Sequence, residues 1–81
     1  MEDTIIPAVA QFIATEILKQ PHRVIQPDER LISSGLVDSF SLVDLALFIE
    51  NRFGVYLANT ELTPDVFDTL TELSRLIQSR M

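Results

Sequence analysis

Residues 39–53 form the stretch that most constrains the fold of this chain. Asp38 immediately before them is a good helix N-cap, and Gly54 immediately after them suits the left-handed position that ends many helices. Asp38 at the start and Arg52 near the end also complement the dipole of such a helix. We therefore predict a helix over residues 39–53, against which the other segments must pack.

The first segment of the chain also has helical periodicity. Apolar residues recur with helical spacing over residues 4–18, and Asp3 or Thr4 can cap this helix. Pro7 is tolerable there because it lies near the first turn. Residues 20–34 lose the periodicity and form a long connection, which four apolar side chains are expected to pin onto the core: Val24, Ile25, Leu31 and Ile32.

The last third of the chain predicts two more helices. Threonine followed by proline marks a helix start, so residues 64–67 are expected to form one short helix. Asp68 can cap a final helix over residues 69–79. No alternation typical of a strand persists anywhere. We expect an all-α fold, a small bundle of three main helices plus one short helix, with residues 1–81 forming a single domain.

The helix over residues 39–53 carries two apolar groups. On a helical wheel that starts at Ser39, one side collects Leu42, Leu45, Ala46, Ile49 and Phe53. The side of Ser39 collects Phe40, Val43 and Leu47, with Asp44 and Glu50 at the border. Phe48 falls opposite Ser39 and is expected under a loop. The second group is either a protein-binding surface rimmed by charge or a part of the core beneath the long connection, and periodicity leaves both open.

Composition excludes several classes of function. Twelve acids against six bases give a net charge of −6, which disfavours nucleic acid and favours partners with basic surfaces, although the charge can also serve solubility alone. The absence of cysteine fits a reducing compartment, and the acidic first residues differ from a signal peptide, so we expect a cytoplasmic protein. The longest apolar run, residues 45–49, is too short to span a membrane.

Ser39 is the candidate functional residue. A helix start offers free backbone N–H groups and the positive end of the dipole, so a phosphate ester on this hydroxyl would be stabilised. The only histidine, His22, lies in the long connection, and residues 35–39 do not form the nucleophile elbow of hydrolases. With one histidine and no cysteine, metal-ligand spacing is also missing. We expect an attachment point in a protein that is not an enzyme.

The stretch Gly35-Leu36-Val37-Asp38-Ser39-Phe40 and the helix after it resemble the acyl carrier protein family, which includes peptidyl and aminoacyl carriers. The resemblance extends to the layout of the whole chain. It implies that Ser39 accepts 4′-phosphopantetheine from coenzyme A through a separate transferase with Mg²⁺. The arm would then carry an acyl or aminoacyl group as a thioester, supplied by a loading ligase and passed to a downstream synthase or transferase.

The resemblance also assigns the second apolar group to partner binding. We call this group with its acidic rim the docking face: Asp38, Phe40, Val43, Asp44, Leu47 and Glu50. The resemblance implies service in fatty-acid, polyketide, nonribosomal-peptide or specialised lipid biosynthesis, and we expect a monomer. Gly35, Phe40 and Ser41 depart from the pattern of fatty-acid carriers, which disfavours general fatty-acid synthesis and favours a specialised stand-alone carrier of an aminoacyl, polyketide or unusual lipid group. The alternative is a helical interaction domain that resembles a carrier but is never modified.

Overall fold

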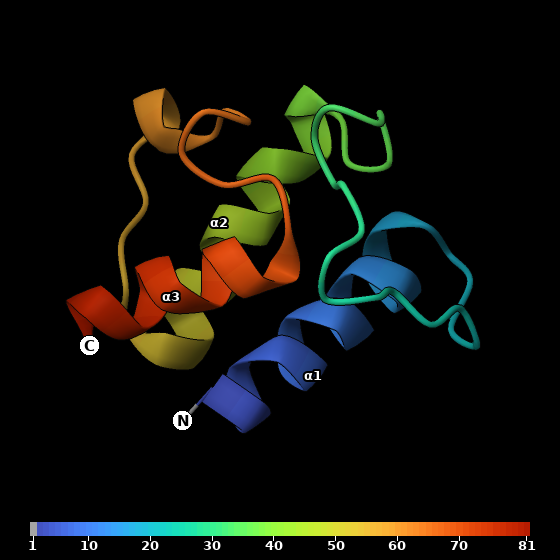
Figure 1. Ribbon diagram of the computed structural model, residues 1–81, viewed down its shortest axis with the longest axis horizontal. Helices are drawn as coiled ribbons and strands as arrows, with labels where there is room; N and C mark the ends of the chain where they lie inside the picture. The colour runs from blue at the N-terminus through green and yellow to red at the C-terminus, as the bar shows by residue number, and fades with distance from the viewer. Residues whose placement is uncertain (1) are drawn as a thin grey trace.

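The computed structural model describes residues 2–81, with side chains from residue 4 onward. All regular elements in this part of the chain are helical: α1 (Glu2–Phe12), the π-helical turn η1 (Ile13–Ile17), α2 (Ser39–Phe53), the 3₁₀ turn η2 (Asn59–Glu61) and α3 (Leu70–Arg80). The three main helices pack into a small bundle in which both chain ends lie on the same side (Figure 1). The predicted all-α bundle is confirmed.

The first helix differs from the prediction at both ends. It includes Asp3 and Thr4, which therefore lie inside the helix instead of capping it, and Pro7 stands in its second turn. At the other end, the Leu18 N–H donates to the Ile13 carbonyl at 2.9 Å, the wider spacing of a π-turn. The helical run then ends before Lys19, whose φ of 56° is left-handed.

The core is formed by one face from each main helix together with residues of the connections. Its buried hydrophobic residues are Ile5, Val9, Ile13, Ala14, Ile25, Leu31, Val37, Leu42, Leu45, Ile49, Val55, Leu57, Phe67, Leu70, Leu73 and Ile77. Phe48, predicted to lie beneath a loop, is covered by α1 instead: its ring stacks on Phe12 with 4.4 Å between centroids. The prediction missed this contact because it depends on how α1 and α2 pair.

Both predicted caps of α2 are confirmed. The Ser41 N–H donates to the Asp38 carboxylate at 2.8 Å, and the Asp38 carbonyl begins the helical hydrogen bonding by accepting from the Leu42 N–H at 2.9 Å. Gly54 adopts a φ of 72° and donates its N–H to the Glu50 carbonyl at 2.9 Å. The left-handed conformation there favours glycine. These local interactions set the helix bounds at the residues that the sequence predicted.

The long connection is fastened to the start of α3. Asp68, which was predicted to cap the last helix, is buried and accepts hydrogen bonds from the backbone N–H groups of Ile32 at 2.7 Å and Ser33 at 2.9 Å. Its carboxylate oxygens also accept hydrogen bonds from the Ser33 hydroxyl and the Arg30 guanidinium. The N-cap of α3 is Thr69 instead. Figure 1 shows the resulting path of the connection, along one side of the molecule and up to the start of α2.

Hydrogen bonding to Asp68 changes its acidity. Burial alone raises the pKa of a carboxyl group, but the hydrogen bonds from Ser33, Ile32 and Arg30 outweigh burial and lower the pKa of Asp68 to about 2. Apolar anchors support the same attachment, since Ile25 and Leu31 are buried and Ile32 is half-buried. Val24, predicted as a fourth anchor, is 74% exposed.

The short helix lies earlier in the chain than predicted. Residues 64–67 form a turn in which the Thr63 carbonyl accepts from the N–H groups of Val66 and Phe67. Phe67 enters the core and Asp68 turns toward the long connection, so the chain leaves the helical path after one turn. The short helical turn of the structure is η2, which precedes the predicted segment.

Candidate functional site

Ser39 is the first residue of α2 and is exposed. Its position next to the extended Asp38 places the hydroxyl at the N-terminus of a 15-residue helix. The positive end of that helix dipole stabilises a negatively charged group. An exposed hydroxyl in this place fits a phosphodiester, because the bulk of an attached group can extend into solvent without displacing the core.

Asp38 supports the site through the backbone. Hydrogen bonds from Ser41 to its carboxylate lower the pKa of Asp38 below the ordinary value of 3.8. The side chain is therefore a carboxylate near neutral pH, and it fixes the start of α2 directly before Ser39. Asp38 thus serves as the helix cap and also contributes negative charge beside the hydroxyl.

The apolar members of the docking face are exposed. Phe40 is 85% exposed, Val43 47% and Leu47 54%, whereas the inward residues Leu45 and Ile49 are almost completely buried. The long connection, fastened at Asp68, does not cover the outward group. The interpretation of this group as part of the core is therefore wrong, and an apolar surface stands open to solvent.

Charged residues border this apolar surface. Asp44 and Glu50 are exposed on α2, as is Asp38 at its start. The structure thus leaves all six predicted docking residues exposed, five of them on α2 and Asp38 at its N-cap, with Ser39 among them. Exposed apolar side chains rimmed by charge are typical of protein-binding surfaces.

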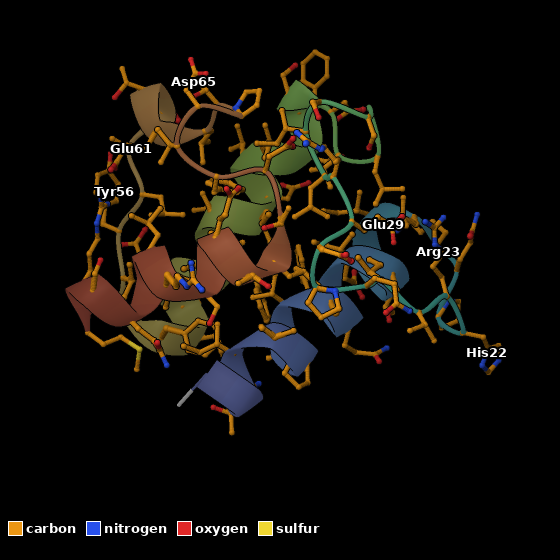
Figure 2. All side chains as sticks on the ribbon, in the orientation of Figure 1. His22, Arg23, Glu29, Tyr56, Glu61 and Asp65 are labelled. Carbon is orange, nitrogen blue, oxygen red and sulfur yellow. The ribbon has the colours of Figure 1, made fainter. Side chains whose placement is uncertain are left out.

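His22 lies in the α1–α2 connection and points away from the body of the molecule (Figure 2). Among the side chains that the structure describes, residues 4–81, no group of three or more histidine and acidic side chains could hold a metal ion. None of the helices described there has the length and hydrophobicity needed to cross a bilayer.

A groove that the sequence did not predict lies where η1 and the end of α1 face α2. It has a volume of about 650 Å³, and its lining residues are Phe12, Glu16, Lys19, Asp44, Leu47, Phe48, Asn51 and Arg52. The stacked rings of Phe12 and Phe48 contribute the aromatic part of the lining. No local signal in the sequence could reveal this groove, because it exists only where two segments separated by more than 20 residues pack together.

This chain is similar to known proteins over most of its length. Residues 9–78 match the family described as a phosphopantetheine attachment site. The D-alanyl carrier protein of Bacillus subtilis is 35% identical over 65 residues, which cover 80% of this chain and 77% of that protein.

Two further relatives carry the same name. The D-alanyl carrier protein of Bacillus pumilus is 31% identical over 61 residues, covering 75% of this chain and 72% of the relative. The protein of that name from Bacillus velezensis is 44% identical over 43 residues, which cover 53% of this chain and 55% of the relative. The stretch similar to the latter is thus only about half of either chain.

Proposed function

The chain belongs to the phosphopantetheine attachment-site family, and from this premise we propose that Ser39 is the residue that holds the arm. Members of the family are carriers with a covalent 4′-phosphopantetheine group, and this chain is a carrier, not an enzyme. The observation that supports Ser39 most directly is its exposed hydroxyl at the N-terminus of α2. Its role is to supply that oxygen to a phosphodiester formed by a separate transferase.

We propose D-alanine as the cargo. Three relatives are named D-alanyl carrier proteins, and two of them are similar to this chain over at least 75% of its length. The arm supplies a thiol, which holds the aminoacyl group as a thioester. The partners are then a phosphopantetheinyl transferase, a ligase that activates and loads the amino acid, and a downstream acceptor enzyme. We place this exchange in the cytoplasm and the carrier in the monomeric state.

The docking face is the proposed contact surface for these partners. Its support is the exposure of Phe40, Val43 and Leu47 beside Ser39, bordered by Asp44 and Glu50. The apolar side chains would be buried on docking, whereas the acids would steer a basic partner into register.

Mass spectrometry tests the attachment residue. We expect the protein, incubated with coenzyme A, Mg²⁺ and a broad-range phosphopantetheinyl transferase, to gain the mass of one phosphopantetheine group. Ser39→Ala should gain nothing. Ser41→Ala is the matched control, because Ser41 lies in the same first turn and its backbone N–H still binds Asp38. Transfer of the arm to Ser39→Ala, or no transfer to the protein without a substitution, contradicts the proposal.

A second measurement tests the cargo. The arm-bearing protein is incubated with ATP and a D-alanine-activating ligase, in parallel with a fatty acyl ligase and its substrate. We expect a mass increase of one alanyl residue with the first enzyme and none with the second. If only the fatty acyl ligase acylates the arm, the protein is still a carrier, but the assignment of D-alanine as its cargo is wrong.

A further inference from the structure

We propose that the groove between η1, α1 and α2 receives the far, aminoacyl-bearing end of the arm while the carrier is free in solution. This inference rests on the proposed attachment at Ser39. The groove is partly apolar, through Leu47 and the stacked rings of Phe12 and Phe48. A smaller hollow of about 410 Å³ adjoins it and shares Phe12, Glu16, Phe48 and Arg52.

The charges around the groove are free to bind a ligand. Two acids, Glu16 and Asp44, and two bases, Lys19 and Arg52, contribute to the lining, and all four are exposed. Among the side chains described from residue 4 onward, none of these four takes part in an ion pair. The groove therefore offers both signs of charge around an aromatic surface.

This chemistry matches an aminoacyl arm. A D-alanyl thioester ends in an ammonium group, which carboxylates and aromatic faces both attract. The arm has two amide carbonyls, which accept hydrogen bonds from lysine and arginine. Its methyl groups and methylene chain suit contact with Leu47 and Phe48. A fatty acyl end has no ammonium group to interact with Glu16 and Asp44, so an aminoacyl end is the better match to the groove.

The groove also lies within reach of Ser39. Asp44 and Leu47 follow Ser39 by five and eight residues, about 7.5 and 12 Å along the helix axis, and lie about 140° and 80° around it. The path over the helix surface to either residue is then about 14 Å. From phosphorus to sulfur the arm has the length of four to five extended residues, about 15 Å, and the alanyl group adds to this.

Seating of the arm has a consequence for docking. The path from Ser39 to the groove crosses Val43 and Leu47, which belong to the docking face. A partner that covers these side chains excludes the seated arm. Docking would therefore release the loaded end at the moment when the partner can use it, and between encounters the thioester would be less accessible to water.

Amide chemical shifts of ¹⁵N-labelled protein test the inference. Three forms are compared: without the arm, with the arm, and with D-alanine held by an amide in place of the thioester to prevent hydrolysis. We expect the D-alanyl form to shift the amides of Glu16, Phe48 and Asn51 in addition to those next to Ser39. Shifts confined to the neighbours of Ser39 would overturn the inference. Mass spectra of the same samples separate this outcome from a failure of attachment at Ser39.

A charge reversal gives a second test. In Glu16→Lys the ammonium group meets a cation in place of a carboxylate, so the D-alanyl-dependent shifts at Phe48 and Asn51 should largely disappear. Asp65→Lys is the matched control, since Asp65 is exposed in the segment before α3 and is not part of the groove (Figure 2). Unchanged shifts in Glu16→Lys, with the melting temperature preserved, would contradict the inference.

Discussion

The two faces of α2 are built from similar residues and have opposite environments. Leu45 and Ile49 on the inward face are almost completely buried, whereas Leu47 and Val43 on the outward face are about half exposed. Residue type therefore does not separate the faces. Their difference comes from what lies opposite each of them in the bundle.

The outward face is open because the long connection is held elsewhere. Asp68 binds the backbone of Ile32 and Ser33, and the Pro27 carbonyl accepts the Thr71 N–H at 3.1 Å. These bonds fasten the connection to the start of α3, so it does not fold over Val43 and Leu47. Openness of the docking face is thus a property of the whole fold, maintained by a buried carboxylate far from it in sequence.

Truncation of one leucine on each face should give the largest contrast. Leu45→Ala leaves a cavity in the core and should lower the free energy of unfolding by about 2–5 kcal/mol. Leu47→Ala should change it by about 0.5 kcal/mol or less. Urea denaturation followed by circular dichroism measures both, and equal losses would show that Leu47 is buried in solution.

Removal of the carboxylate that fastens the connection should have the next largest effect. Asp68→Ala leaves the N–H groups of Ile32 and Ser33 without their partner, and we expect a loss of about 2–3 kcal/mol of stability. Hydrogen exchange at these two amides should accelerate. Asp65→Ala, an exposed acid of the same segment, should change neither quantity measurably.

The lowered pKa of Asp68 predicts that the free energy of unfolding falls at low pH. The folded pKa of Asp68, about 2, lies below its ordinary value of 3.8, so its contribution is fully present above about pH 4 and is lost as pH falls toward 2. That difference corresponds to about 2 kcal/mol. Pairing with Arg80 also lowers the pKa of Glu61 to about 2, which acts in the same direction. Asp68→Asn should flatten the fall of the unfolding free energy at low pH, and an unchanged slope of that free energy against pH would contradict this assignment.

The kinetics of arm transfer by the phosphopantetheinyl transferase test the outward face of α2 more directly. Leu47→Asp should lower kcat/KM for arm transfer by roughly tenfold, about 1.4 kcal/mol, because a charge enters the apolar part of the docking face. The free energy of unfolding should hardly change. An unaltered kcat/KM would mean that the transferase docks elsewhere.

The smallest effect is expected at the acidic rim. Asp44→Asn or Glu50→Gln should reduce kcat/KM by about two- to threefold, because exposed ion pairs contribute about 1 kcal/mol or less. The difference from the unmodified sequence should shrink as salt is raised. A loss that is independent of salt would indicate a role other than electrostatic steering.

Local signals made much of this protein predictable from its sequence. Asp38 and Gly54 set the bounds of α2 through hydrogen bonds that span only a few residues, so Ser39 could be placed at a helix start. The apolar spacing predicted three main helices for the same reason. The docking face could be named as a group of side chains, but periodicity alone did not show whether it was exposed.

Tertiary structure decided the features that join distant segments. Asp68 resembles an ordinary cap in sequence, but its partners lie 35 and 36 residues away, and Phe48 meets Phe12 only because α1 packs on α2. The groove and the openness of Val43 and Leu47 follow from these contacts. Sequence alone therefore determined where α2 begins and ends and where Ser39 lies, since those depend on near neighbours. The packing of the whole chain decided which surface is left free.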